Sequence, residues 1–174
     1  MKRLFFLILL TSAAFFVSAN ESPEAKIKEL GIKLTTPAAP IANYVRAVRT
    51  GNLVFLSGHG PSKPEGGYVT GKVGRDLTLE QGQEAARLTA IALLSSLKAE
   101  IGSLDKVTRI VKLTGMVNCD PAFTGQSQVI NGCSDLLVAV FGEKKGKHAR
   151  AAVGMASLPI GLAVEIEMIV EVAD

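Results

Sequence analysis

The strongest constraint on the fold is an unbroken alternation of apolar and polar side chains near the C-terminus, in residues 164–172 (VEIEMIVEV). One face of this predicted strand carries Val164, Ile166, Met168, Val170 and Val172, and the other carries Glu165, Glu167, Ile169 and Glu171. Because polar groups are costly to bury without partners, we expect the first face to meet the core and the second to meet something wetter. Residues 148–155 read as another strand, and the Leu-Pro-Ile-Gly sequence between the two predicts a hairpin.

The first 19 residues have the organisation of a secretory signal peptide. Lys2 and Arg3 precede an uncharged apolar run over residues 4–17, which is too short for a comfortable membrane span. Val17, Ser18 and Ala19 have the small-residue pattern of a cleavage site. We therefore expect an exported protein, periplasmic or secreted, that is free of the membrane after cleavage. An uncleaved N-terminal anchor is the alternative.

The charge balance argues against binding to a nucleic acid. Removing the 19-residue leader from the 174 residues leaves 155, which is enough for one domain with its own core. The remainder contains 17 Lys and Arg against 16 Asp and Glu, with no Trp and two Tyr. A nearly neutral chain with few aromatic residues is a poor candidate for contacting a phosphate backbone. We divide the chain into a signal peptide (1–19), a tail and extended lead-in (20–40) and a single domain (41–174).

The two cysteines, Cys119 and Cys133, leave two possibilities open. Export would permit a disulfide. However, if the second predicted helix begins near Phe123, Cys133 lies about 15 Å along its axis from the preceding loop, whereas a disulfide needs Cα atoms within about 7 Å. We favour two free thiols. Neither cysteine has a His or Cys neighbour at metal-ligand spacing.

The remaining patterns predict a mixed α+β domain. Strands are expected over residues 44–49, 53–57 and 105–116, with helices over 78–101 and 125–141 and a Gly/Pro-rich excursion after residue 60. Thr78 and Gln81 form a capping box at the start of the first helix, and Gly102 is suited to its end. Two helices can cover one face of the sheet. The opposite face carries Ile169 and is therefore half apolar, which suggests burial against other subunits.

Several segments resemble the Rid family (YjgF-type, reactive-intermediate deaminases), whose members were also described as endoribonucleases. The segment HARAAVGMASLPIGLAVEIEMI is similar to the family signature, and weaker matches lie in residues 42–45, 53–58 and 129–131, so the resemblance extends over about residues 35–172. It implies a chorismate-mutase-like (YjgF-like) domain in a homotrimeric barrel, with ligand clefts between subunits. It also implies hydrolysis of 2-imino or enamine acids to 2-keto acids and ammonia, without a metal or organic cofactor.

The resemblance assigns the two main roles to Arg150 and Glu165. Arg150 corresponds to the arginine that binds the substrate carboxylate, a task suited to a planar and permanently charged guanidinium. Glu165 corresponds to the glutamate that holds or polarises the attacking water. Outside the resemblance, a surface or interface salt bridge would explain either residue.

Five further residues correspond to substrate-contacting positions. Tyr44 is similar to the tyrosine that closes the cleft from a neighbouring subunit, and Ser57 and Gly58 match the Ser-Gly pair at a strand end. Asn131 is similar to a helix asparagine near the cleft, and Ala152 corresponds to a position beside it. A half-buried aromatic, a turn sequence and an ordinary helix asparagine are the alternatives for Tyr44, Ser57–Gly58 and Asn131.

The chain also departs from the family pattern. His148 replaces the usual proline, and Ala152 replaces a frequent cysteine, so no thiol is expected there. The loop from Gly115 to Asn131 reads as longer than usual. His59 follows the Ser-Gly pair, where it could titrate near neutral pH and join the site or could be a loop histidine without a special role.

Two other functions compete with imine deamination. A trimer that binds small carboxylates without catalysis, or that serves as a scaffold, would fit a protein exported away from the usual cytoplasmic sources of imines. A ribonuclease would fit the older family label. The near-neutral charge and the absence of a paired His/Lys constellation argue against ribonuclease activity.

Overall fold

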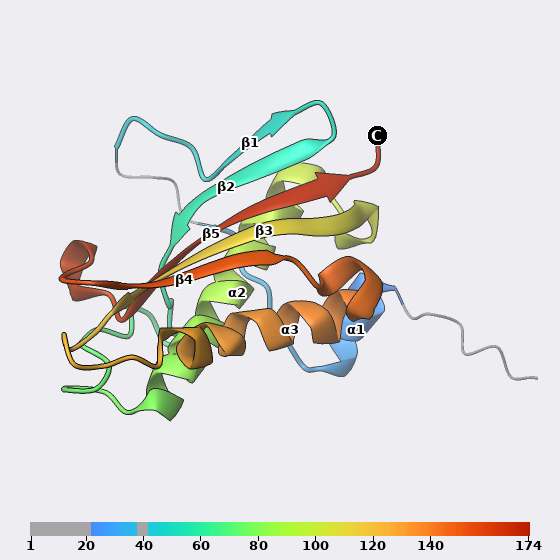
Figure 1. Ribbon diagram of the computed structural model, residues 1–174. Helices are drawn as coiled ribbons and strands as arrows, with labels where there is room; N and C mark the ends of the chain where they lie inside the picture. Colours follow the sequence, from blue (N-terminus) through green and yellow to red (C-terminus); the bar gives the residue numbers. More distant parts are fainter. Residues whose placement is uncertain (1–21, 38–41) are drawn as a thin grey trace, which may run out of the picture.

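The computed structural model describes residues 22–37 and 42–174 as a five-stranded mixed sheet with helices on one face (Figure 1). The signal peptide predicted at residues 1–19 lies outside the described residues, so cleavage and export stay predictions. Within the described part of the chain, no helix has both the length and the apolar character needed to cross a bilayer.

The strands are β1 (Ala47–Thr50), β2 (Leu53–His59), β3 (Val107–Asn118), β4 (Ala149–Met155) and β5 (Val164–Val172), in the spatial order β1-β2-β5-β3-β4. The pair β3–β4 is parallel, and the other three neighbouring pairs are antiparallel. The helices are α1 (Pro23–Glu29), α2 (Leu79–Ile101) and α3 (Gln126–Gly146), with 3-10 turns at Leu104–Lys106 and Pro159–Gly161.

The predicted C-terminal hairpin is wrong. β4 pairs with β3 at the edge of the sheet, whereas β5 lies between β2 and β3. The Leu-Pro-Ile-Gly sequence forms a 3-10 turn within a longer connection that carries the chain past β3. Its tip is strained, because Ile160 adopts φ 49°, a value that a β-branched residue rarely adopts.

Two helical crossovers place the helices on the same face. β2, β3 and β4 run in the same direction, and parallel strands need a long connection, which α2 and α3 provide. The predicted capping box begins α2: the Thr78 hydroxyl accepts from the Gln81 amide at 3.2 Å, and the Gln81 side chain accepts from the Thr78 amide at 2.8 Å. The α+β class and the two covering helices predicted from the sequence are confirmed.

The core lies between the sheet and the helices. The alternation in β5 is confirmed, since its even-numbered residues are buried and its odd-numbered residues are half-buried or exposed. The core side of the sheet meets buried leucines and alanines of α2 and α3. The largest fully buried side chains include Leu93, Leu94, Leu97, Ile110, Leu113, Ile130, Leu137, Ile166 and Met168.

The segment 20–40 differs from the predicted extended lead-in, because it contains α1. Ser22 caps this helix and Pro23 occupies its first turn. Its Ile27 is only 6% exposed and joins the core, while Glu24 accepts from the Leu104 amide at 3.0 Å and pairs with Lys98. This part of the lead-in is therefore an integral part of the domain.

Cys119 and Cys133 are free, as predicted, and both are buried. Cys119 follows the end of β3, and Cys133 lies in α3. The connection between these elements covers residues 119–125, so most of the predicted long loop between Gly115 and Asn131 is strand or helix.

Candidate functional site

A β-bulge in β2 shapes the first part of the candidate site. Leu56 pairs with Met168 and His59 pairs with Ile166, so β2 has one more residue than β5 in this interval. Ser57 and Gly58 occupy the bulge, a feature that often lies next to functional sites because it redirects the strand. The irregularity is the reason that Leu56 and His59, three residues apart, both face the core.

Glu165 extends over this bulge on the face of the sheet that the helices leave open. Its carboxyl group lies so close to Gly58 that a Cβ atom there would come within 2.8 Å of Glu165 Cδ. No hydrogen bond or ion pair joins this carboxylate to another described residue. Burial, followed by the nearby Glu167, raises the pKa of Glu165 above its ordinary value. We call Ser57, Gly58 and Glu165 the glutamate half-site.

Arg150 lies on edge strand β4 and points toward α3. Its Nη1 donates to Asn131 Oδ1 at 2.9 Å and to Ser134 Oγ at 3.0 Å, and its Nη2 donates to the Ser127 carbonyl at 3.3 Å. All three acceptors are neutral, and Arg150 has no carboxylate partner among the described residues. We call Arg150 with Ser127, Asn131 and Ser134 the arginine half-site.

The sequence reasoning missed Ser127 and Ser134. A signal for them existed, because residues 127, 131 and 134 have the i, i+4, i+7 spacing that places side chains on one face of a helix. Two small hydroxyl residues flanking a predicted site asparagine at this spacing form a polar stripe. The face of α3 that Arg150 contacts could therefore have been located from the sequence.

The two half-sites do not meet within one chain. Arg150 pairs with Leu113 of β3 and shares the face of buried residues, whereas Glu165 pairs with Met116 and faces the opposite side. Strand spacings of about 4.8 Å and a rise of about 3.3 Å per residue place their Cα atoms roughly 14 Å apart. Arg150 and Glu165 of one chain therefore do not face the same small ligand.

Tyr44 and Ala152 also lie apart from each other. Tyr44 is 49% exposed and precedes β1, so it lies outside the strand predicted for it and near the edge of the sheet opposite to Arg150. Ala152 lies on β4 two residues after Arg150, on the same face, and packs against the core. Of the predicted site residues, Arg150, Asn131 and Ala152 thus lie near the β4 edge of the sheet, and Tyr44 lies near the β1 edge.

His59 is not a loop residue but a buried one at the end of β2. Its Nδ1 bonds to the Ser57 carbonyl at 2.7 Å and its Nε2 bonds to Ser96 Oγ of α2 at 2.7 Å. Burial lowers the pKa of His59, which favours the neutral ring. Burial likewise raises the pKa of the Cys133 thiol to about 12, so this thiol stays protonated and is a poor nucleophile.

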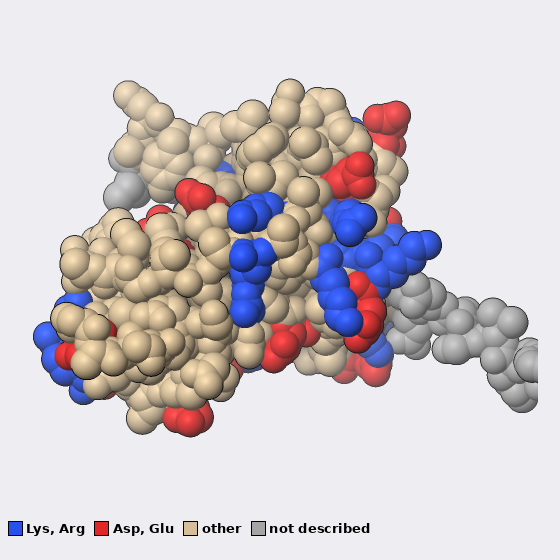
Figure 2. All heavy atoms as spheres, viewed as in Figure 1, with Lys and Arg blue, Asp and Glu red and all other residues tan. Residues whose placement is uncertain are grey.

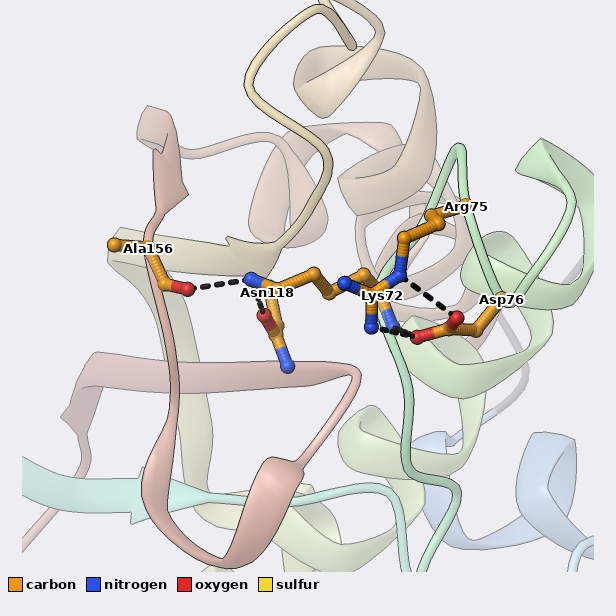
Figure 3. A network of polar contacts seen from close by, with 5 residues as sticks. All are labelled: Lys72, Arg75, Asp76, Asn118 and Ala156. Atoms are coloured by element: carbon orange, nitrogen blue, oxygen red, sulfur yellow. Dashed lines mark hydrogen bonds and ion pairs between the residues drawn. The ribbon is translucent and has the colours of Figure 1, made fainter.

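A second polar cluster fastens the Gly/Pro-rich excursion to the ends of the strands (Figure 3). Lys72 Nζ donates to Asn118 Oδ1 at 2.9 Å and to the Ala156 carbonyl. On the same loop, the hydrogen bond from Arg75, assisted by the Lys72 amide, lowers the pKa of Asp76 to about 2. These contacts hold the loop against β3 and the residue after β4, which is a structural role.

The open face of the sheet carries an apolar patch beside the glutamate half-site. Val48, Phe55 and Ile169 align across β1, β2 and β5, and Val48 and Phe55 are 53% and 41% exposed. They border a shallow hollow of about 340 Å³ that also reaches Ser57 and Glu167. Within the described ranges, no group of three His, Cys, Asp or Glu residues could hold a metal ion.

Comparisons with known proteins identify the family. The sequence model described as endoribonuclease L-PSP matches residues 35–172, and this is the family also called YjgF or Rid. The chain belongs to the L-PSP (YjgF/Rid) family. The resemblance inferred from the sequence is thereby confirmed, together with the α+β fold that it implied for the single chain.

Three relatives show how much of the chain is shared. Protein TCP17 of Trypanosoma cruzi is 48% identical over 155 residues, covering 89% of this chain and 97% of the relative. The crystal structure of Atu1372 from Agrobacterium tumefaciens is 46% identical, with a TM-score of 0.80 and coverage of 87% of this chain and 92% of the other. Protein HMF1 of Saccharomyces cerevisiae is 27% identical over 137 residues, covering 78% of this chain and 88% of the relative.

Proposed function

We propose that this L-PSP family member hydrolyses 2-imino or enamine acids to 2-keto acids and ammonia. The observation that carries the proposal is the state of Arg150, whose guanidinium is held by three neutral oxygens and has no carboxylate partner among the described residues. Of its five N–H donors, three contacts leave Nε–H and one Nη2–H free. A planar, two-oxygen carboxylate is the ligand that such a pair of donors binds best.

The carboxylate of Glu165 supplies the base that hydrolysis of the imine needs. A water oxygen attacks the imine carbon, and the carboxylate holds that water and accepts its proton. The imine nitrogen takes up that proton as the carbinolamine forms. Glu165 then carries the proton of the carbinolamine hydroxyl to the nitrogen, the C–N bond breaks as the C=O bond forms, and ammonia leaves. The upward shift in the pKa of Glu165 favours this exchange, because a base with a pKa closer to the working pH can take up and release a proton.

The separation of the half-sites supports a site shared between copies of the chain. Arg150 lies on the β4 edge, while Glu165 and the bulge open onto the uncovered face beside exposed Val48 and Phe55. A neighbouring copy that covers this apolar face would bring its arginine edge to the glutamate half-site. We propose that the active form is the homotrimer typical of the family, with Tyr44 closing each cleft.

The first test generates imines from an amino-acid oxidase and follows their conversion to 2-keto acids. Arg150→Ala should abolish the acceleration, and Arg150→Lys should restore little, because a lysine lacks the paired planar donors. Arg87→Ala is the matched control, since Arg87 pairs with Glu84 on α2 away from both half-sites. Full activity in Arg150→Ala would refute the assignment.

The second test mixes chains of two inactive variants, Arg150→Ala and Glu165→Gln, by unfolding and refolding them together. If each site takes Arg150 from one copy and Glu165 from another, some sites in the mixture contain both native residues and activity returns. If both residues of a site came from one chain, mixing would restore nothing. This result separates a shared site from a site within one subunit.

Two competing functions are outcomes of the same experiments. Binding of 2-oxobutanoate without turnover of any imine would favour a carboxylate-binding trimer. RNA cleavage that persists through rigorous purification would favour the activity named in the family description. On the face shown in Figure 2, Lys and Arg side chains lie beside Asp and Glu side chains and form no unbroken basic surface, which argues against an RNA groove there.

A further inference from the structure

Arg150 is connected to His148 through one hydroxyl group. Ser134 Oγ lies 3.0 Å from Arg150 Nη1 and 3.1 Å from His148 Nε2. His148 Nδ1 lies 2.7 Å from the Gly146 carbonyl. Both histidine and serine are half-buried, so these contacts are partly shielded from competition by water.

Chemistry fixes the direction of two hydrogen bonds in this series. A guanidinium only donates and a backbone carbonyl only accepts, so Arg150 donates to Ser134 and His148 Nδ1–H donates to Gly146. The Ser134 oxygen accepts from Arg150, so its own proton is free to go to His148 Nε2. When His148 is neutral with its proton on Nδ1, its Nε2 accepts from the Ser134 hydroxyl.

We propose that Ser134 and His148 are positioning residues that fix the plane of the Arg150 guanidinium for carboxylate binding. The inference rests on the proposed function of Arg150 and extends it to two side chains. The contacts occupy both Nη1 donors and one Nη2 donor, and they leave the Nε–H and the other Nη2–H without a hydrogen bond to the described residues. A donor pair with a fixed orientation loses less rotational freedom on binding and therefore binds more tightly than a mobile one.

The surroundings of His148 favour its neutral form. Burial is the largest influence that lowers the pKa of His148, and the positive charge of Arg150 lowers it further. The family pattern has proline at this position, and a proline side chain can accept no hydrogen bond from Ser134. The hydrogen-bonded series Arg150–Ser134–His148 therefore depends on the histidine that this chain has in place of proline.

Four variants and one probe test the inference. Dissociation constants for 2-oxobutanoate are measured by titration calorimetry on the mature protein in its native oligomeric state, and KM and kcat are measured in the imine assay. Ser134→Ala and His148→Leu should each weaken binding roughly tenfold and raise KM, with kcat changed less than about twofold. Ser134→Thr keeps the hydroxyl and His148→Gln keeps an acceptor near the Nε2 position, so both should retain most of the affinity.

The readouts separate the inference from a merely structural role. A merely structural contact would lower the free energy of unfolding of Ser134→Ala and His148→Leu in urea titrations and leave their affinity for 2-oxobutanoate unchanged. If Arg150→Ala abolishes 2-oxobutanoate binding while Ser134→Ala and His148→Leu bind normally, the positioning role is refuted and the proposed function stands. If Arg150→Ala itself binds normally, the proposed function fails first and the positioning role fails with it.

Discussion

Replacing Gly58 with alanine should reduce activity by moving Glu165 while leaving its carboxylate intact. The new Cβ would clash with Glu165 Oε1 and lie 2.8 Å from Cδ and 3.0 Å from Cγ, where ordinary contacts are 3.4–4 Å. The carboxyl carbon must therefore move by at least about 0.6 Å, and the oxygen must move farther. Misplacing a reacting group by about 1 Å can cost on the order of 100-fold, so we expect kcat to fall by roughly 10- to 100-fold.

The fold itself should tolerate this change. The clashing atoms are the far end of a flexible side chain that faces the open side of the sheet, and Gly58 does not have a left-handed backbone conformation. We expect the free energy of unfolding to change by less than about 1 kcal/mol. The predicted signature is thus a large loss in kcat in a protein that unfolds at nearly the same denaturant concentration.

Gly60→Ala provides a matched control. Its Cβ would lie 2.8 Å from Leu162 Cδ1, as close as the carbon contact at Gly58, but the group that must move is a buried apolar side chain. This variant should lose about 1–3 kcal/mol of stability through overpacking and retain its kcat. Kinetics in the oxidase-coupled assay and urea titrations of both variants provide the comparison. Normal kcat in a folded Gly58→Ala protein would refute the role given to the position of Glu165.

Three further predictions concern stability and are measured by urea unfolding. Gly132→Ala should destabilise the protein by roughly 3 kcal/mol, because its Cβ would clash with the Gln83 carbonyl where α2 and α3 pack closely; an unchanged midpoint would contradict this packing. Thr78→Ala should cost about 1 kcal/mol through loss of the cap, while Thr78→Ser should cost less. Burial lowers the pKa of His59 from 6.5, so the unfolded chain binds the proton more readily than the folded chain. The free energy of unfolding should therefore be highest above about pH 6.5 and should decrease as the pH falls below this value. His59→Gln should show a shallower decline between pH 7 and pH 5.5, and an identical slope would show that His59 is not responsible.

Local sequence patterns predicted the individual helices and strands better than they predicted which strands pair with each other. The alternation in β5 and the cap of α2 depend on residues a few positions apart, so the local amino-acid sequence determines them. The pairing of β4 depends on which distant strand can reach it. The sequence around Pro159 is compatible with a tight hairpin as well as with the longer connection that the structure contains. Only the crossover by α3 explains why β4 joins β3 instead.

The residues of the candidate site could be predicted from the sequence, but their positions relative to one another could not. The C-terminal motif drew attention to Arg150 and Glu165, and the helix asparagine Asn131 does contact Arg150. Their separation follows from the insertion of β3 between β4 and β5, and the register on β3 places them on opposite faces of the sheet; no local pattern contains either feature. The link from Arg150 to His148 depends on a serine on a separate helix, and no local sequence pattern reveals it.

The central position of β5 has a consequence for how the protein is made. Of the five strands in the described residues, β5 comes last in sequence and occupies the middle of the sheet, with β2 on one side and β3 on the other. A nascent chain that lacks residues 164–172 can form α2 and join β3 to β4, but it has nothing to connect these strands to β1 and β2. The sheet should therefore close only after residues 164–172 have been synthesised, and deleting them should divide the sheet rather than shorten its edge.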